Sequence, residues 1–279
     1  IGNATHDICI LPPERVGALY EALITNNVKE TKLADNVTMI TLPKGAIWMA
    51  EYSPHLFIRP CHEEMYQQIM RGATGAPQEG VLVTGNPGSG VLQLQLSSIY
   101  RLGKSWFLNY CLYRLFQEKR FPICYHHRQS RSVILFNADG FTRCRDTEHI
   151  DRLTELMLLD KDPNAIYLVE APESHVPLEP LIVNAFTILA ATFNRAHYTS
   201  FLKRGLGKVR KFYMPTWTAA ELLAVAPELN ANKQTVMSRF IKFGGIPRYV
   251  FDTSCIFDVE LEEAIEGCKP TYLRATLSS

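Results

Sequence analysis

The stretch Val81-Leu82-Val83-Thr84-Gly85-Asn86-Pro87-Gly88-Ser89-Gly90 has the form of a short apolar strand followed by the front half of a G-x-x-x-x-G-K-[ST] loop. The next residue is Val91, and the missing pair appears later, in Gly103-Lys104-Ser105. The thirteen residues 91–103 therefore interrupt the motif. Without them the sequence reads Gly-Asn-Pro-Gly-Ser-Gly-Lys-Ser-Trp-Phe-Leu, which is a complete phosphate-binding loop (P-loop).

The residue types of this loop serve one chemical purpose. Glycines let the backbone curl until several N–H groups converge on the α- and β-phosphates of a nucleotide. Lys104 reaches the β- and γ-phosphates, and the Ser105 hydroxyl ligates Mg²⁺ at the positive end of the following helix. Gly85–Gly90 alone is equally typical of a plain turn. The Gly-Lys-Ser string ahead of the apolar run 106–116 favours the P-loop.

Length and composition limit the alternatives. With 279 residues, the chain can bury one large core, or a core and a small added domain. It is 47% hydrophobic and 20% charged with a formal net charge of +1, which gives no global attraction to nucleic acid or membrane. No run of about 18 apolar residues is present, so no membrane span is expected. The chain starts at Ile1 without a signal-peptide pattern, and we expect a fragment or a processed form.

The cysteines and histidines do not predict a metal centre. The seven cysteines are scattered, odd in number and form no C-x-x-C pair, which favours buried reduced thiols over disulfides or zinc. His126-His127 has no second pair at ligand spacing, so a solvated or hydrogen-bonded pair is the favoured interpretation.

Apolar runs and helical periods alternate from residue 76 to residue 215, which predicts an α/β core with a mostly parallel sheet flanked by helices. Residues 1–75, with helical segments at 14–24 and 63–70, are expected to form a lead-in region that packs on this core. The expected strands are Gly80–Thr84, Pro122–His126, Ser132–Asn137, Ala165–Glu170 and Phe186–Phe193, and the expected helices are Lys104–Gln117 and Thr147–Leu159.

After Pro215 the pattern changes to helices, which predicts a helical lid subdomain over residues 216–279. Thr218 and Glu221 have the S/T-x-x-E spacing of a capping box, which opens a helix. The expected helices are 221–226 and 233–243, the second ended by Gly244-Gly245.

A nucleotide hydrolase also needs an acidic group at the end of a neighbouring strand, to serve Mg²⁺ and to polarise the attacking water. Ile166-Tyr167-Leu168-Val169-Glu170 supplies it in the Walker B form, four apolar residues followed by a carboxylate. Any buried strand can end in a surface acid, but the P-loop upstream favours the catalytic interpretation. Asp139, after another apolar run, is the alternative.

Three further features are candidates for phosphate or water contacts. Thr192, Asn194 and Arg195 end a predicted strand, where Asn194 or Thr192 would orient a water; a helix cap is an equal alternative. Arg248, after Gly244-Gly245-Ile246-Pro247, would reach a γ-phosphate from the lid, or else be a surface Arg after a helix stop. The basic stretch 203–211 fits nucleic acid phosphates, but a solvated loop is the favoured interpretation.

Taken together, these strings resemble the P-loop NTPase module of Crinkler effectors of oomycetes and some fungi, which is related to the retrotransposon hot spot proteins of trypanosomes. The resemblance covers about residues 81–251 and implies a STAND/AAA-like NTPase core with a helical lid. It further implies ATP and Mg²⁺ as ligands, secretion, and delivery to a host cell, commonly to its nucleus. Besides the two loop halves, it rests on Tyr167-Leu168-Val169-Glu170, Phe212-Tyr213-Met214-Pro215-Thr216-Trp217-Thr218 with Glu221-Leu222-Leu223, and Phe243–Phe251.

The chain departs from this family in two respects. It contains neither a ubiquitin-like header nor a nuclease-like or kinase-like toxin domain, and its P-loop is interrupted. A retained short intron would explain residues 91–103, because codons at both ends can supply splice sites in frame.

The leading hypothesis is an ATP-binding and ATP-hydrolysing regulatory module. The alternatives are an interaction scaffold that no longer binds nucleotide, and a nucleic-acid-binding part of a nuclease effector. A host protein or nucleic acid is the expected macromolecular partner, and the oligomeric state stays open.

Overall fold

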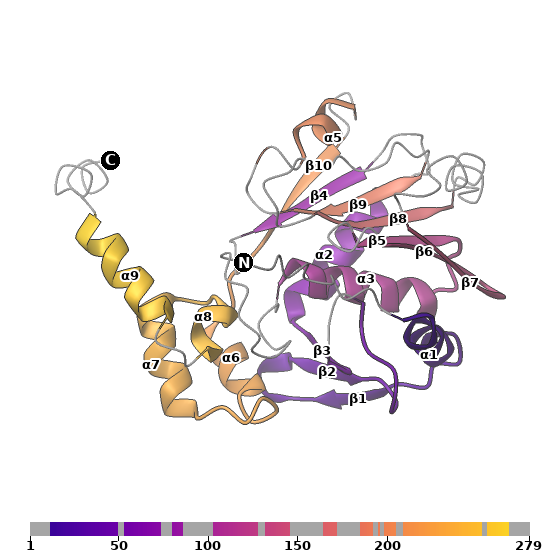
Figure 1. Ribbon diagram of the computed structural model, residues 1–279. Helices are drawn as coiled ribbons and strands as arrows, with labels where there is room; N and C mark the ends of the chain where they lie inside the picture. The colour runs from indigo at the N-terminus through magenta and orange to yellow at the C-terminus, as the bar shows by residue number, and fades with distance from the viewer. Residues whose placement is uncertain are drawn as a thin grey trace, which may run out of the picture.

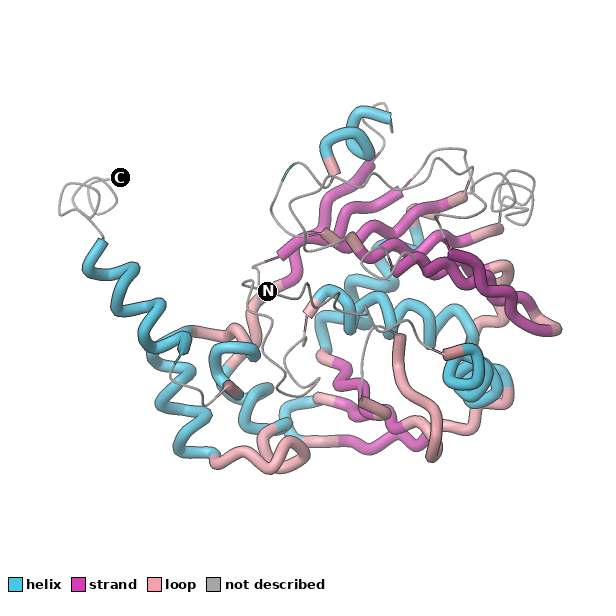
Figure 2. Tube along the Cα trace, viewed as in Figure 1, coloured by secondary structure: helices cyan, strands magenta, loops and turns pink. Residues whose placement is uncertain are grey.

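The computed structural model describes residues 12–49, 53–73, 80–85, 103–127, 132–145, 164–171, 185–191, 195, 198–204, 209–252 and 256–267 (Figure 1). Within these residues the chain forms a seven-stranded sheet, a smaller three-stranded sheet and several helices, coloured by type in Figure 2. The predicted helix Thr147–Leu159 lies outside the described residues.

The large sheet has the strand order β10-β4-β9-β8-β5-β6-β7. The first five strands run parallel to one another, and the last two add antiparallel pairs, so the predicted mostly parallel sheet is confirmed. Its strands are β4 (Gly80–Gly85), β5 (Ile123–His127), β6 (Ser132–Asn137), β7 (Gly140–Arg145), β8 (Ile166–Glu170), β9 (Phe186–Ala190) and β10 (Val209–Met214).

Both faces of this sheet are covered, which explains why its parallel strands are apolar without interruption. In β8, Ile166 and Leu168 belong to the main hydrophobic cluster, whereas Tyr167 and Val169 belong to a second cluster. Helix α3 (Lys104–Gln117) packs on the first face, and Phe201 and Leu202 of α5 (Thr199–Arg204) pack against the second cluster.

Helix α3 lies between the two sheets, as Figure 1 shows. Almost every residue from Trp106 to Phe116 is buried, and Arg114 is the exception. A helix that is apolar all round needs cover on all sides. The large sheet gives this cover on one side, and the small sheet with α1 and α2 gives it on the others.

The small sheet, with the order β1-β2-β3, is a feature that the sequence did not predict. Its strands are four residues long, and β1 reads Lys-Glu-Thr-Lys, without an apolar alternation. The lead-in region consists of α1 (Pro13–Ile24), β1 (Lys29–Lys32), the short helix η1 (Ala34–Asn36), β2 (Thr38–Thr41), β3 (His55–Ile58) and α2 (Pro60–Arg71).

All described elements after Met214 are helices, as predicted. Thr218 and Glu221 form the expected capping box, with Glu221 N–H donating to Thr218 Oγ1 over 3.1 Å and Thr218 N–H donating to Glu221 Oε2 over 2.8 Å. The helices are α6 (Ala219–Val225), α7 (Lys233–Phe243), α8 (Pro247–Phe251) and α9 (Ile256–Gly267).

The prediction of a loop over 203–211 was wrong at both ends. Residues 203–204 end α5, and residues 209–211 begin β10, the edge strand of the large sheet. Arg210 donates hydrogen bonds to the carbonyls of Gln68 and Ile69 in α2. The Arg210 side chain, which was predicted to be solvated, therefore links α2 to the large sheet.

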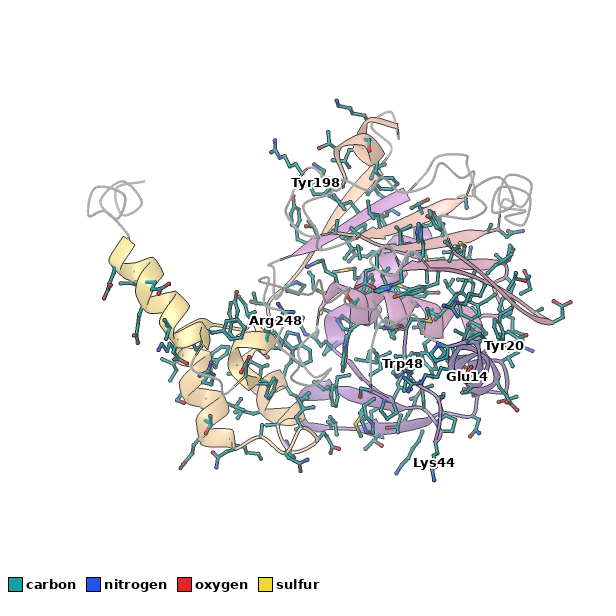
Figure 3. The ribbon with its side chains drawn as sticks, in the orientation of Figure 1. Glu14, Tyr20, Lys44, Trp48, Tyr198 and Arg248 are labelled. Atoms are coloured by element: carbon teal, nitrogen blue, oxygen red, sulfur yellow. The ribbon has the colours of Figure 1, made fainter. Side chains whose placement is uncertain are left out.

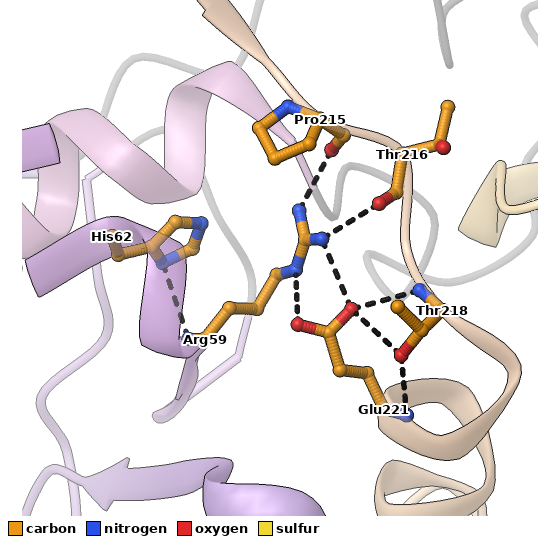
Figure 4. Close-up of polar contacts among 6 residues, drawn as sticks. All are labelled: Arg59, His62, Pro215, Thr216, Thr218 and Glu221. Carbon is orange, nitrogen blue, oxygen red and sulfur yellow. Dashed lines mark hydrogen bonds and ion pairs between the residues drawn. The ribbon is translucent and has the colours of Figure 1, made fainter. Parts of the chain in front are cut away.

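One buried guanidinium joins the lead-in region to the helical region (Figure 4). Arg59, 3% exposed, forms a bidentate pair with Glu221 of α6 at 3.1 and 3.0 Å. It also donates to the carbonyls of Pro215 and Thr216 over 2.8 and 2.7 Å, and lies 4.9 Å from the Trp217 ring centre. The end of β3, the end of β10 and the start of α6 are therefore fixed together.

The same cluster contains a neutral histidine. Burial, together with the nearby Arg59 guanidinium, lowers the pKa of His62 to about 3. Its Nδ1 accepts the backbone N–H of Arg59 over 3.4 Å, and its ring packs 5.7 Å from Phe107 of α3. His62 is thus uncharged in the folded protein near neutral pH and packs as a core side chain.

Replacement of Arg59 by Met should lower the free energy of unfolding by about 3–5 kcal/mol, because buried Glu221 would keep its charge without a cation. Denaturant unfolding followed by circular dichroism measures the loss. Arg114→Met is a matched control, since the Arg114–Glu63 pair has exposed fractions of 22% and 46% and should contribute less. The double variant Arg59→Met/Glu221→Leu should recover part of the loss. If Arg59→Met lowers the free energy of unfolding no more than Arg114→Met does, the buried Arg59–Glu221 pair does not hold these regions together.

Candidate functional site

The candidate site lies at the carboxyl edge of the parallel strands. Strand pairing places Val83, Ala190, Glu170 and His127 in one row across β4, β9, β8 and β5. Gly85 lies two residues beyond this row, at the end of β4. Because the carboxyl ends of parallel strands meet at one edge, ligands of open α/β sheets bind there.

Ser105 and Glu170, predicted as partners from separate motifs, are in contact. The Ser105 hydroxyl, in the first turn of α3, donates a short hydrogen bond to Glu170 Oε1. The Glu170 side chain is 14% exposed, and its Oε2 is buried. The hydroxyl and the carboxylate that the sequence assigns to Mg²⁺ therefore lie together at the sheet edge, although 65 positions apart in the sequence.

His127 is the third member of this group, and sequence reasoning missed it. Its Nε2 lies 3.6 Å from Glu170 Oε2, and its side chain is 13% exposed. The preceding His126 turns to the other side of β5, where Nδ1 lies 2.6 Å from the Tyr167 hydroxyl. The hydrogen-bonded interpretation of the histidine pair was right for His126, while His127 faces the candidate site.

The start of α3 adds a positive electrostatic field to this edge. Gly103 is the N-cap residue, which has no side chain of its own to cap the helix, and Lys104 is the first helical residue. The first N–H groups of a helix have no intrahelical partner and carry partial positive charge, which favours an anion at this position. Lys104, half-buried, adds a full positive charge.

Several predicted site residues lie outside the described part of the chain: Asn86, Pro87, Gly88, Ser89, Gly90, Thr192 and Asn194. Arg195 is described, but no contact links its side chain to the group formed by Ser105, Glu170 and His127. Asp139, the alternative to Glu170, is excluded from this edge. It lies in the turn after antiparallel β6, at the opposite edge of the sheet, where Tyr20 donates to the carbonyls of Asn137 and Ala138.

The helical region leaves the sheet at the same edge. Met214, the last residue of β10, pairs with Gly85 of β4, and the chain then continues through Pro215 into α6. Arg248 belongs to α8, which lies on the side of the helical region nearest the rest of the molecule in Figure 3. Helix α8 is held by Gly245, whose carbonyl accepts the Trp217 N–H over 2.8 Å.

Two curated proteins are similar to the chain. They are Crinkler effector proteins 15 and 16 of Phytophthora infestans, each 27% identical over 189 residues. The match covers 66% of this chain but only 27% of each relative, so the chain spans about a quarter of their length. These similarities support the Crinkler-like relationship.

No model of a known protein family matches the chain. Among solved structures, the closed state of Hsp104 with ATPγS and FITC casein aligns with a TM-score of 0.39 and 10% identity, over 68% of this chain and 35% of that one. Within the described residues, no helix is long and apolar enough to cross a membrane.

Replacement of Gly85 by Ala should destabilise the protein by about 1–3 kcal/mol, the usual cost of overpacking. A Cβ at Gly85 would lie 2.9 Å from Met214 Cβ and 3.1 Å from the Met214 carbonyl, neither of which is the end of a flexible side chain. Gly103→Ala is the matched control, because a Cβ there meets none of the described residues within 4 Å. Thermal unfolding measures the melting temperature of each variant. Equal melting temperatures for Gly85→Ala and Gly103→Ala would show that β4 and β10 separate easily at this edge.

Proposed function

We propose that the chain is an ATP-binding and ATP-hydrolysing module of a Crinkler-like effector. The observation that carries the proposal is the contact between Ser105 at the start of α3 and Glu170 at the end of β8. Two motifs chosen for separate roles in one reaction lie in contact at the sheet edge where nucleotides bind in open α/β folds.

Phosphate binding is assigned to the loop halves. The backbone of Gly85–Gly90 and Gly103 would surround the α- and β-phosphates, and Lys104 would contact the β- and γ-phosphates. The start of α3 supports this assignment, since the first N–H groups of a helix have no intrahelical partner and favour an anion.

The residues fit a magnesium ion. A hydroxyl and a carboxylate are oxygen donors of the kind that Mg²⁺ prefers, and Mg²⁺ binds through few protein ligands and substrate phosphates. Glu170 Oε2 is buried and accepts no hydrogen bond from the described residues, so it has capacity for another ligand. Ser105 and Glu170 would hold the ion, which when bound neutralises charge on the phosphates.

The hydrolytic step is assigned to Glu170 as general base, which would accept a proton from the attacking water. His127 would hold the carboxylate from the side of Oε2. Asn194 would orient the water, and Arg248 would stabilise charge on the γ-phosphate from the lid. Residues 76–215 would then be the NTPase core, with 1–75 as a packed lead-in and 216–279 as the lid.

The whole effector would be delivered to a host cell. Secretion, transfer to a host cell and entry into its nucleus rest on the similarity to Crinkler effectors. A host protein or nucleic acid would then be the macromolecular partner of the whole effector.

Lys104→Ala and Glu170→Gln should separate binding from hydrolysis. Lys104→Ala should abolish ATP binding, because the variant removes the positive charge that would contact the phosphates. Glu170→Gln should keep ATP binding while lowering turnover by roughly 10², the scale of general-base catalysis. Calorimetry and phosphate release measure the two properties, with Asp139→Asn as the control for an acid at the opposite edge. Unchanged hydrolysis in Glu170→Gln would remove Glu170 from the reaction.

Deletion of residues 91–103 should raise ATP affinity by orders of magnitude. With the segment present, Gly90 and Lys104 are joined by thirteen residues, and the ring of N–H donors forms only if the segment loops out, at an ordering cost of about a few kcal/mol. The Ser105–Glu170 contact exists with the segment present, so the gain should appear in phosphate binding. ATP titration of both chains measures it. Equal affinity would mark residues 91–103 as a tolerated surface insertion, and no binding by either chain would favour the interaction scaffold.

A further inference from the structure

A cleft of about 360 Å³ lies between the small sheet and the second half of α3, which face each other in Figure 1. The candidate site uses the first turn of the same helix, so the two sites are separate. Ligand pockets in proteins have about 300–1,000 Å³, and a cleft at the small end of this range favours a metabolite over a polymer. Its lining includes Glu30, Lys32, Ile40, Ile58, Glu63 and Tyr113.

One face of the small sheet forms the floor of the cleft. Strand pairing places Lys32, Thr38 and Ile58 in one row across β1, β2 and β3. Glu30 pairs with Ile40 two residues farther along. Paired residues of antiparallel strands, and residues two positions apart on one strand, point to the same face. The floor therefore combines two apolar side chains, on β2 and β3, with two opposite charges on β1.

The wall formed by α2 and α3 is polar, but its groups already have partners. Glu63 Oε2 accepts hydrogen bonds from Tyr110 and Arg114, and Oε1 accepts one from Gln67 over 2.9 Å. Burial acts to raise the pKa of Glu63, but these hydrogen bonds lower it to about 2. Glu63 is therefore charged and paired at neutral pH without a ligand.

Glu30 and Lys32 differ from this wall, because each has unused hydrogen-bonding capacity. Glu30 Oε1 accepts the Tyr113 hydroxyl over 2.6 Å, while Oε2 accepts no hydrogen bond from the described residues. Lys32 uses one of its three N–H groups, which donates to Thr38 Oγ1 over 2.9 Å. Among the described residues no ion pair joins Glu30 to Lys32. A carboxylate and an ammonium on one strand are thus both open to a ligand.

Protection of the sheet edge does not explain both charges. β1 is an edge strand, and lysines on edge strands discourage pairing with another chain, which would account for Lys32. Glu30 is instead held over the floor by Tyr113 of α3, whose ring packs edge-on against the buried Trp48 at 6.4 Å. A carboxylate that is oriented from a second element is typical of a binding site.

We propose that this cleft binds a small zwitterion of the amino-acid type. The ligand ammonium would donate to Glu30 Oε2, and the ligand carboxylate would accept from Lys32, about 7 Å farther along the strand. An apolar ligand side chain would cover Ile40 and Ile58. Glu30 would repel a simple anion and Lys32 a simple cation, so a molecule that carries both charges fits better than either.

Isothermal titration calorimetry of the full chain, without nucleotide, tests each of the common amino acids in turn. At least one with an apolar side chain should bind with a dissociation constant of about 1 mM or lower. Two analogues of the tightest ligand separate its charges: the amide lacks the carboxylate, and the deaminated acid lacks the ammonium. Each analogue should bind about tenfold more weakly or worse, because one charge-assisted hydrogen bond is lost. The titration does not involve ATP, so its result is independent of the proposed hydrolysis.

Lys32→Met and Glu30→Gln assign each ligand charge to one side chain. Lys32→Met should lower the affinity for the amino acid by about tenfold but should not weaken binding of the amide, which has no carboxylate to lose. Glu30→Gln should lower the affinity for the amino acid similarly but should not weaken binding of the deaminated acid, which has no ammonium.

Two control variants make the same substitutions outside the cleft. Lys44→Met and Glu14→Gln change exposed residues labelled in Figure 3, and both should bind the amino acid as the unchanged chain does. Circular dichroism should show the same helix content in all variants. The proposal is overturned by any of three outcomes: no common amino acid binds, both analogues bind as tightly as the amino acid, or the control variants lose affinity equally.

Discussion

The buried guanidinium of Arg59 is the constraint on which the arrangement of the regions depends. It has partners in three directions: the Glu221 carboxylate, the carbonyls of Pro215 and Thr216, and the face of Trp217. A buried charge is tolerated only when it is paired and hydrogen-bonded. The helical region therefore has its orientation fixed where it leaves β10, and a lead-in residue sets that orientation. The lead-in region is thus a structural partner of the helical region.

Helix α3 connects the surroundings of Arg59 with the candidate site. Its apolar surface is covered by the large sheet on one side and by the small sheet on the other, and His62 beside Arg59 packs on Phe107. A helix packed on all sides has little freedom to shift, because protein interiors are close-packed. Its first turn, with Lys104 and Ser105, is consequently held at the sheet edge by contacts made farther along the helix.

The sequence predicted those elements whose local signals agree with their tertiary setting. Lys104–Gln117 and Lys233–Phe243 have the predicted bounds, and the buried strands follow their apolar runs closely. It failed for β1 and β10, where polar or basic residues form strands because neighbouring strands and α2 provide their partners. His127 could not be assigned to the site either, because its position beside Glu170 follows from the pairing of β5 with β8, which no local pattern encodes.

The Ser105–Glu170 hydrogen bond would limit which ligands the proposed site accepts. In the structure these two groups satisfy each other, so the buried carboxylate is not left without a donor. A ligand of the Ser105 hydroxyl or of Glu170 Oε1 would have to replace this bond, so it would need to interact strongly with the group that it uses, whereas Oε2 could accept a ligand without breaking it. His127 contacts the other oxygen and can hold Glu170 in place while Ser105 changes partner. At this edge of the sheet, the proposed site would therefore favour a ligand that brings positive charge to the Glu170 carboxylate.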